Sequence, residues 1–534
     1  MLVTSALPYA NGDIHLGHLV EYLQTDFWVR YQKMIGKEAL YICADDTHGT
    51  PVMISAKEKK ITPEELIKYY QDRHTADFKD FEIKFDNYYT THSKENQMLA
   101  TEFYKAMQAG EHIVTKKVEQ LYCEKDKMFL PDRFVKGTCP KCQAAAQYGD
   151  SCDHCGATYS TSDLENPGCV VCGEKPVLKE SEHLFFALNH FKDFLQAWIA
   201  KHTNTEISKK LSEWFNEDLR DWNISRDEPY FGFKIPDKAD KYFYVWLDAP
   251  IGYISSTIDW CKKNDCNYED YWKNEETEIY HFIGKDIIYF HALFWPAMLK
   301  TAGYNLPEQV FVHGFLTVNG EKMSKSKGTF ITARKYLDLL NPLYLRFYYA
   351  SKLSSGIDDI DFNLDDFFNK VNSELIGKIT NLASRSVQIL NKHDLAVIES
   401  DEKGNELIAF ARGKKDIIAK YYEQREFSRV IMELRDIAET ANRFMEEQQP
   451  WQVIKSDKAK ASQILSAVVN VFRIIAIYLK PILPSYVENV EKLFAENNYT
   501  WKDIDTTLTN IKPAKYEHLL QRIDREALDK LTAE

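Results

Sequence analysis

Two histidines stand three residues apart in the segment His15-Leu16-Gly17-His18, shortly after an apolar run and a turn. Residues at this spacing share one face of a helix, and the first turn of a helix presents unpaired backbone N–H groups. Such a helix start binds anions, and two imidazole rings would add donors toward a phosphate. Gly17 has no side chain, so an adenine ring or a ribose could approach the backbone closely. Two ordinary surface histidines would give the same tetrapeptide, so this motif does not decide the function by itself.

A basic segment, Lys322-Met323-Ser324-Lys325-Ser326, lies between the turn pair Asn319-Gly320 and Gly328. These neighbours predict a loop rather than the interior of a helix or strand. Two lysines on a mobile loop can close on a triphosphate and neutralise the charge that builds up as pyrophosphate leaves. The alternative is a solvated basic loop, which the presence of the histidine motif in the same chain disfavours.

Cysteines cluster between residues 123 and 172, mostly as C-x-x-C pairs. Two of these pairs have the spacing of a zinc ribbon, and their members are Cys139, Cys142, Cys152 and Cys155. This spacing predicts a tetrahedral, structural Zn²⁺ site. A second set could hold another zinc, since a carboxylate oxygen is an acceptable ligand, and it comprises Cys123, Asp126, Cys169 and Cys172. Carboxylates and thiolates also lie close together without binding metal, so one or two zinc ions per chain are expected.

The segments around the two basic motifs predict an α/β domain. Residues 3–7, 39–44, 242–247 and 279–283 are expected to be strands, and residues 14–34 and 287–301 helices. Asp13 is the expected cap of the first helix. Strands that alternate with helices indicate a parallel sheet, whose ligand sites lie at the carboxyl ends of the strands.

The order of these elements predicts a Rossmann-type parallel-sheet domain that is split by a zinc-binding insertion and followed by an all-α bundle. The expected divisions are the first half of the sheet domain at 1–115, the insertion at 116–226, the second half at 227–311, a loop and connecting stem at 312–364, and the bundle at 365–534. The last region has helical periodicity and few Pro or Gly breaks up to about residue 478.

Composition indicates a soluble protein of several domains, with 44% hydrophobic and 28% charged residues in 534. The formal net charge of −13 does not favour nucleic-acid binding, but a local basic face can still bind nucleic acid. No signal peptide is recognisable before the first strand. The longest apolar stretch, residues 464–483, is interrupted by polar residues and predicts a buried core helix rather than a membrane span. We therefore expect a cytoplasmic protein that makes no membrane contact.

The two motifs resemble the HIGH and KMSKS signatures of class I aminoacyl-tRNA synthetases. The flanking segments resemble the methionyl-tRNA synthetase family in particular, namely residues 6–12 (ALPYANG), 43–46 (CADD), 244–253 (YVWLDAPIGY) and 282–286 (FIGKD). The likeness covers essentially the whole chain. It implies activation of L-methionine with ATP to methionyl-adenylate, release of pyrophosphate, and transfer of methionine to the terminal ribose of tRNA(Met).

The resemblance also implies the residues of the ATP site, which are His15, Gly17, His18, Asp286, Lys322, Met323, Ser324 and Lys325. Of these, His15, His18, Lys322 and Lys325 are the implied catalytic groups. Mg²⁺ is expected to accompany the phosphates, although no residue stands out as its ligand.

The implied methionine-binding residues are Ala6, Leu7, Tyr9, Asp46, Trp246, Ala249, Pro250, Tyr253, Ile287 and His291. Aromatic walls suit a thioether, and Tyr253 or His291 could offer a hydrogen to its weakly accepting sulfur. Asp46 would pair with the ammonium group of the substrate. The alternatives are that Trp246 and Ile287 belong to the core and that Asp46 caps a helix. The insertion is short and rich in cysteine, unlike the editing domain of the synthetases for valine, isoleucine and leucine, and this favours methionine.

In the bundle, Asn381, Arg385 and Trp451 match the positions at which the family reads the anticodon. Aromatic stacking and Asn or Arg hydrogen bonds are how single-stranded bases are recognised. The alternatives are an exposed helix arginine and a tryptophan that covers the end of the bundle. No C-terminal dimerisation domain of the family is evident, so a monomer is expected. Three rivals are less favoured: a synthetase for another amino acid such as cysteine, a small-molecule nucleotidylyltransferase, and an inactive tRNA-binding relative.

Overall fold

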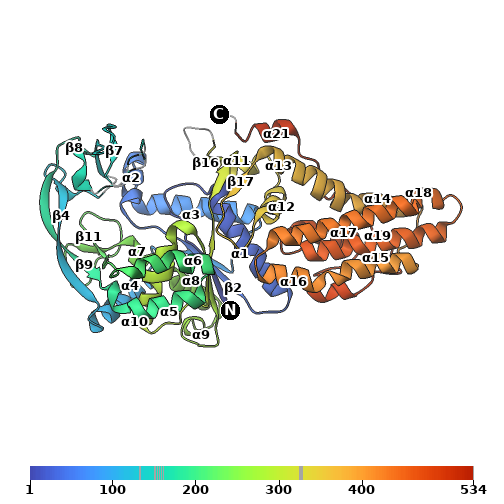
Figure 1. The fold of residues 1–534 in the computed structure, drawn as a ribbon, viewed down its shortest axis with the longest axis horizontal. Helices are drawn as coiled ribbons and strands as arrows, with labels where there is room; N and C mark the ends of the chain where they lie inside the picture. Colours follow the sequence, from blue (N-terminus) through green and yellow to red (C-terminus); the bar gives the residue numbers. More distant parts are fainter. Residues whose placement is uncertain are drawn as a thin grey trace.

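The structure is a computed structural model of the chain, and it describes residues 1–131, 134–149, 152, 154, 155, 157, 159, 161–323 and 329–532. The molecule is elongated (Figure 1). The α/β part and the cysteine-rich insertion occupy one end, and long helices extend to the other.

The α/β part is built on a five-stranded sheet in the order β14-β13-β1-β2-β3. Its strands are β1 (Leu2–Ser5), β2 (Leu40–Asp45), β3 (Asn87–Thr90), β13 (Ile279–Gly284) and β14 (Gln309–His313). Every neighbouring pair is parallel. The central strands are buried along their whole length, as expected for a parallel sheet that helices cover on both faces. The parallel sheet predicted from the sequence is confirmed.

Strand β1 lies between β2 and β13, so the strand order reverses at β1. Helix α1 (Leu16–Met34) follows β1 and starts at this reversal point. Side chains alternate along β1, so Leu2 and Val3 pack into separate hydrophobic clusters on the two faces. Helix α8 (Ile251–Asn264) packs on β2 and β3, and α4 (Lys94–Ala109) packs on α8. The crevice at such a reversal point is where open α/β sheets bind ligands.

Two local predictions were wrong. Helix α1 is capped by the side chain of His15, whereas Asp13 forms an ion pair with Arg73. The strand expected at 242–247 ends early: β12 (Lys241–Phe243) pairs with β11 (Ser225–Asp227), and a helical turn, α7 (Val245–Asp248), follows. The helix expected at 287–301 is present, although it is not a regular α-helix throughout.

That helix is built in three pieces. A 3₁₀ turn η5 (Lys285–Ile287), a π-helical segment η6 (Phe290–Phe294) and α10 (Trp295–Ala302) follow one another. Pro296 lies at the start of α10 and lacks the N–H that a continuous α-helical ladder would need at that point. π-helical turns are frequent at functional sites, and His291 lies in this one.

The insertion is carried by a long antiparallel ribbon of β4 (Ile113–Cys123) and β9 (Val177–Phe186). Its end carries a small sheet in the order β7-β6-β8, formed by β6 (Val135–Thr138), β7 (Gln147–Tyr148) and β8 (Glu165–Cys169). Figure 1 shows this small sheet at the edge of the molecule, away from the helical bundle.

A connecting region joins the sheet to the bundle. It contains a small sheet of β15 (Leu316–Val318), β16 (Glu321–Lys322) and β17 (Ile360–Phe362), with α11 (Ala333–Leu337) and α12 (Pro342–Lys352). The basic segment begins at Lys322, the last residue of β16, and its residues 324–326 lie outside the described residues.

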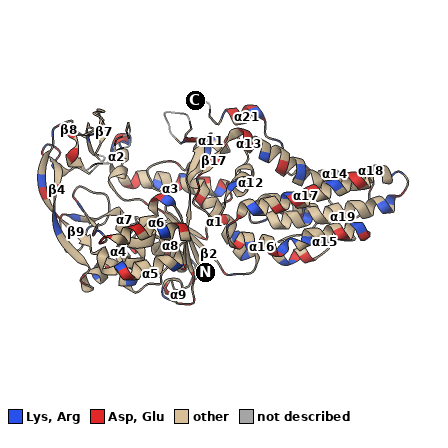
Figure 2. Cartoon of the chain, in the orientation of Figure 1, with Lys and Arg blue, Asp and Glu red and all other residues tan. Residues whose placement is uncertain are grey.

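The bundle comprises α14 (Asn381–Lys392), α15 (Glu402–Gly413), α17 (Phe427–Gln448) and α19 (Lys458–Leu479), with α19 packed against the other three. Among the described residues α19 is the one helix long and apolar enough to cross a membrane, with a mean hydropathy of 1.7. However, 94% of that apolar window is buried inside the protein. The prediction of a core helix is confirmed. Figure 2 shows acidic and basic residues interspersed along the helices of the bundle.

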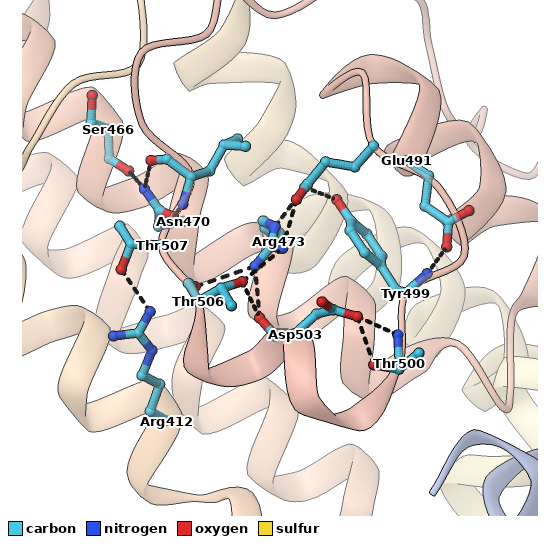
Figure 3. Close-up of polar contacts among 12 residues, drawn as sticks. Arg412, Ser466, Asn470, Arg473, Glu491, Tyr499, Thr500, Asp503, Thr506 and Thr507 are labelled. Atoms are coloured by element: carbon cyan, nitrogen blue, oxygen red, sulfur yellow. Dashed lines mark hydrogen bonds and ion pairs between the residues drawn. The ribbon is translucent and has the colours of Figure 1, made fainter. Parts of the chain in front are cut away.

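The polar residues that interrupt this apolar helix hold the C-terminal segment (Figure 3). Arg473 donates to Glu496 Oε2 at 2.6 Å and to the carbonyl of Asp503 at 2.9 Å. Asn470 exchanges two hydrogen bonds with the backbone of Leu508, at 2.7 and 3.0 Å. A buried polar side chain is stable when its hydrogen bonds are made, and here residues 496–508 supply the partners.

Candidate active site

A cavity of about 840 Å³ opens at the carboxyl ends of the parallel strands. Its walls come from the end of β1, the start of α1, the end of β2, the α7–α8 turn, the end of β13 and the loop after β14. It brings together all the described residues predicted for the ATP and methionine sites. These are Ala6, Leu7, Tyr9, His15, Gly17, His18, Asp46, Trp246, Ala249, Pro250, Tyr253, Asp286, Ile287, His291, Lys322 and Met323. The predicted residues Ser324 and Lys325 lie outside the described part of the chain.

His15 and His18 are linked by hydrogen bonds and by ring stacking at the start of α1. Nδ1 of His15 accepts from the backbone N–H groups of Gly17 and His18 at 3.1 and 3.3 Å, and Nδ1 of His18 accepts from the N–H of His15 at 3.3 Å. The rings stack with their centroids 3.6 Å apart. Because both Nδ1 atoms accept, we assign the ring proton of each histidine to Nε2.

Burial makes both histidines neutral. It lowers the pKa of His15 to about 4, and burial together with the neighbouring His15 lowers the pKa of His18 well below its ordinary value. The two rings can therefore act at neutral pH as N–H donors rather than as cations. Donors at a helix N-terminus favour an anionic group such as a phosphate.

Gly17 separates the two histidines and touches the basic segment. A Cβ at this position would lie 2.5 Å from Cε of Met323 and 3.0 Å from the ring of His15. A side chain here would have to displace Met323 or the capping ring. The small residue thus permits the close approach of the two motifs, which are distant in sequence.

Glu21 is a residue of this cavity that the sequence reasoning missed. It lies one turn after His18 on α1, and its Oε2 is 3.2 Å from Nε2 of His313, whose Nδ1 lies 2.7 Å from the carbonyl of Gly314. Burial raises the pKa of Glu21 to about 7. The spacing of His15, His18 and Glu21 at successive turns was the available sequence signal, since all three share one helix face.

Tyr253 and His291, two of the predicted methionine-binding residues, form a buried hydrogen-bonded pair. The hydroxyl of Tyr253 lies 2.8 Å from Nε2 of His291, and Nδ1 of His291 lies 3.3 Å from the carbonyl of Ile287. A carbonyl only accepts, so Nδ1 carries the proton and Nε2 accepts from Tyr253. Burial lowers the pKa of His291 to about 4, which keeps the ring neutral. The hydroxyl hydrogen of Tyr253 is thereby directed at His291.

Apolar and aromatic groups complete this part of the cavity. The ring of Trp246 stacks on Phe290 with centroids 3.4 Å apart, and both rings face the cavity. Gly252 lies beneath Leu7, and a Cβ there would come within 2.8 Å of Cδ1 of Leu7. Trp246 and Ile287 are only partly buried and line the cavity, and Ile287 also packs against the hydrophobic core.

Asp46 places a buried carboxyl group in the same cavity. Its backbone is held by the N–H of Ala10 and the carbonyl of Pro8, at 2.8 and 2.9 Å. Its Oδ1 is buried without a hydrogen-bond partner among the residues that the structure describes. Burial, and then the nearby carboxyl of Asp248, raises the pKa of Asp46 well above its ordinary value. Asp46 does not cap a helix, since the next helix begins at Thr50 with Gly49 as its cap.

Two groups of four potential metal ligands lie in the insertion, and they are the two sets predicted from the sequence. Within each group the ligand atoms all lie within 4.8 Å of one another. Sulfur atoms around a tetrahedral zinc are about 3.8 Å apart, given Zn–S bonds of about 2.3 Å. Cys142 and Cys152 are 3.5 Å apart, and Asp126 Oδ2 is 3.2 Å from the sulfurs of Cys123 and Cys169. Both groups thus fit a zinc ion and offer four donors, which is the composition of a structural site.

The predicted anticodon residues lie on the bundle. The guanidinium of Arg385 lies 5.1 Å from the ring of Trp451 and pairs with Glu446 at 2.6 Å. Asn381 lies one turn before Arg385 on α14 and lines a separate cavity. The structure therefore brings Arg385 and Trp451 together and places Asn381 beside them along the helix.

Comparisons with known proteins agree with this architecture. The family model of class I tRNA synthetases (M) matches residues 1–387, and the anticodon-binding domain of methionyl tRNA ligase matches residues 397–530. A methionine–tRNA ligase from Bdellovibrio bacteriovorus is 55% identical over 536 residues, covering 100% of this chain and 78% of the relative.

Solved structures share the fold. The methionyl-tRNA synthetase of Mycobacterium tuberculosis bound by methionyl-adenylate has a TM-score of 0.80 at 22% identity, over 97% of this chain and 99% of that one. Its free form has a TM-score of 0.74 at 22% identity, over 98% of each chain. With the two family models and the full-length relative, these matches show that the chain belongs to the methionyl-tRNA synthetase family of class I aminoacyl-tRNA synthetases.

Proposed function

We propose that this chain activates L-methionine with ATP to form methionyl-adenylate and pyrophosphate, and then transfers methionine to the terminal ribose of tRNA(Met). The observation that supports this most is the single cavity at the carboxyl ends of the strands. It joins the histidine motif, the start of the basic segment, a buried carboxyl group with one unpartnered oxygen, and an apolar aromatic pocket.

In the first step, ATP would lie along the start of α1. The Nε2–H groups of His15 and His18, together with the helix N-terminus, would donate to the phosphates as the methionine carboxylate attacks the α-phosphorus. Lys322 and Lys325 would balance the charge that builds up on the departing pyrophosphate. Mg²⁺ would neutralise the phosphates when bound, and Asp286 would help to hold the nucleotide.

Methionine would be held at two ends. Asp46 would bind its ammonium group, because a buried carboxyl oxygen without a hydrogen-bond partner gains from a charge-assisted bond to a cation. The side chain would lie among Trp246, Ile287 and the Tyr253–His291 pair, where burial and sulfur–aromatic contacts favour an unbranched thioether. In the second step a terminal ribose hydroxyl of the tRNA would attack the adenylate carbonyl, and AMP would leave.

The remaining parts have supporting tasks in this proposal. Zinc at one or both ligand groups would fold the end of the insertion and would take no part in the chemistry. Arg385, Trp451 and Asn381 would read the anticodon. The five divisions predicted from the sequence would correspond to these tasks, and we place the reaction in the cytoplasm.

Amino-acid-dependent ATP–pyrophosphate exchange, measured with each of the twenty amino acids and without tRNA, tests the proposal. Exchange with methionine alone is the expected result. Exchange with a different amino acid would overturn the pocket assignment, and absence of both exchange and tRNA charging would overturn the activity.

The basic segment is tested separately with Lys325→Ala, with the exposed Lys79→Ala as a control. We expect adenylate formation to fall by roughly a hundredfold with little change in methionine affinity, because the lysine acts in the transition state. An equal loss of methionine binding would contradict that role.

A further inference from the structure

Two cysteines at the end of α8 lie outside the sites described above. The chain has ten cysteines, and seven of them belong to the two groups of metal ligands in the insertion. Cys43 is buried on β2, where its sulfur lies 3.6 Å from the carbonyl of Ser5. The sulfurs of the remaining two, Cys261 and Cys266, lie 2.6 Å apart. Both are free cysteines, so they form a thiol pair that belongs to neither metal group.

The end of the helix itself holds the two thiols together. Asp265 has φ 51° and ψ 44°, the left-handed conformation with which many helices end. The N–H groups of Asp265 and Cys266 both bond to the carbonyl of Cys261, the second at 3.1 Å. The bond from Cys266 is that of a Schellman cap, in which the side chains at these two positions often touch. Two thiols make that contact here.

Neighbouring elements fasten the same end of α8. Lys263 donates to Oδ1 of Asn87 on β3 at 3.1 Å, and Asn87 donates to Oδ2 of Asp259 at 3.0 Å. Lys262 pairs with Glu95 of α4 at 2.5 Å. Two cysteines can be bridged without backbone movement only where the backbone already brings their side chains together. The last turn of α8 meets this condition.

The two thiols differ in their access to solvent. Cys266 is exposed, whereas Cys261 is only 3% exposed. Burial, and then the neighbouring Cys266, raises the pKa of Cys261 to about 12, so this sulfur carries its proton at neutral pH. The thiolate is the nucleophile, and a reagent in solution therefore meets Cys266 first. An exposed thiol beside a second thiol that can displace the reagent is the arrangement of a reversible oxidation site.

We propose that Cys266 and Cys261 form a reversible disulfide by exchange with a small-molecule disulfide such as oxidised glutathione. The thiolate of Cys266 attacks one sulfur of the reagent, whose S–S bond breaks, and the thiolate that leaves takes up the proton lost by Cys266. Cys261 then attacks the sulfur of Cys266 in this mixed disulfide. Its proton passes to the second leaving thiolate as the Cys261–Cys266 bond forms. Two protein thiols are oxidised and one reagent disulfide is reduced to two thiols.

This oxidation does not depend on the proposed catalytic function, and it is tested on the whole, zinc-loaded protein. The protein is equilibrated in mixtures of reduced and oxidised glutathione, denatured, alkylated and digested. Trypsin cuts at Lys262 and Lys263, between the two cysteines, so they fall in separate peptides, 242–262 and 264–273. We expect these peptides to be joined by a disulfide, while the peptide that carries the buried Cys43 is alkylated. Absence of the joined pair at every glutathione ratio would overturn the proposal.

The contribution of the fold is measured against an unstructured reference, a synthetic peptide of residues 258–270. At half oxidation, the square of the reduced glutathione concentration divided by the oxidised concentration gives the effective concentration of one thiol at the other. We expect this value to be at least about tenfold higher in the protein, because the helix end keeps the sulfurs in contact. Equal values would show that the fold does not favour the bond, which contradicts the proposal.

Two serine variants test the roles of the thiols. Cys261→Ser should retain glutathione on Cys266 as a mixed disulfide, because the displacing thiol is missing. Cys266→Ser, a change at an exposed position, should leave Cys261 unmodified. Glutathione bound to Cys261 in the folded Cys266→Ser protein would refute the assigned order. That result decides the order even where Cys261→Ser fails to fold.

The disulfide should fix the last turn of α8 without disturbing the earlier turns, which carry Tyr253. Amide hydrogen exchange of the oxidised and reduced proteins measures this difference. Oxidation should slow exchange at residues 262–266 and leave exchange at residues 251–257 unchanged. Faster exchange at residues 251–257 would mean that the bond distorts the helix, and the thiols would then not be placed for it as proposed.

Discussion

Arg346 of α12 joins the sheet domain to the bundle through buried hydrogen bonds. Its Nη2 pairs with Asp26 of α1 at 2.7 Å, its Nη1 donates to the carbonyl of Phe81 at 3.0 Å, and its Nε donates to the carbonyl of Ile482, just after α19, at 2.6 Å. The side chains of Arg346 and Asp26 are 0% and 1% exposed. Arg346→Met keeps an unbranched stem but removes the guanidinium group, and it tests what this junction contributes.

The expected loss of unfolding free energy depends on the contacts that Asp26 keeps when the guanidinium of Arg346 is removed. Removing one member of a buried ion pair costs about 3–5 kcal/mol, because the other charge stays buried. Asp26 would keep Arg30 at 2.7 Å and the backbone N–H of Lys84 at 3.0 Å. We therefore expect the lower end of that range, about 3 kcal/mol of unfolding free energy.

Urea unfolding at neutral pH measures this loss, with Arg435→Met as the matched control. Arg435 is 40% exposed and its ion pairs are 3.6 and 3.7 Å long, so its removal should cost less than about 1 kcal/mol. Equal, small losses in the two variants would refute the reasoning. Because Arg346 joins two domains, tRNA charging should also fall more than methionine-dependent ATP–pyrophosphate exchange.

The same pair predicts a dependence on pH. Burial alone would raise the pKa of Asp26, but Arg30 and Arg346 outweigh it and hold the pKa below its ordinary value of 3.8. A lowered carboxyl pKa contributes stability that is present above pH 3.8 and is lost as the pH falls through the lowered value. Arg346→Met should therefore lose less stability on acidification than the unsubstituted protein.

Three further predictions concern the sites. Glu21, whose pKa burial raises to about 7, should become an anion beside the phosphates as the pH rises through neutrality. ATP affinity should then fall between about pH 6 and 8, and Glu21→Gln should flatten that profile; an unchanged profile would exclude Glu21 as its cause. Asp46→Ala should raise the Kd for methionine by about 10- to 100-fold by equilibrium binding, the value of one charge-assisted bond, and an unchanged Kd would contradict its role. Metal analysis should find two zinc ions per chain and one in Asp126→Ala, and a single zinc in the unsubstituted protein would exclude the second site.

The sequence alone predicted those parts of the sites whose geometry depends only on the spacing of residues along the chain. The three-residue spacing of His15 and His18 places them on one helix face, and the C-x-x-C pairs place their sulfurs within reach of one metal ion. Both arrangements are present in the structure. Apolar runs that alternate with helical periodicity likewise predicted the parallel sheet, because strands buried on both faces must be continuously apolar.

A prediction from the sequence failed where the same run of residues is compatible with two kinds of secondary structure. The aromatic run at 242–247 reads equally as a strand or as a helical turn, and it becomes both because β12 finds a partner for only three residues, at β11. The apolar helix α19, by contrast, was correctly predicted to be a core element from the polar residues that interrupt it, and its packing against three other helices confirms this.

The sequence by itself determined which residue types are present and how they are spaced along each element. It could not determine the contacts that decide how they act. The proton position on His291, the pairing of Glu21 with His313 and the unpartnered oxygen of Asp46 all depend on groups brought together by distant strands and loops. Protonation, desolvation and hydrogen bonding respond to the three-dimensional surroundings of a group, and only the tertiary fold supplies those surroundings.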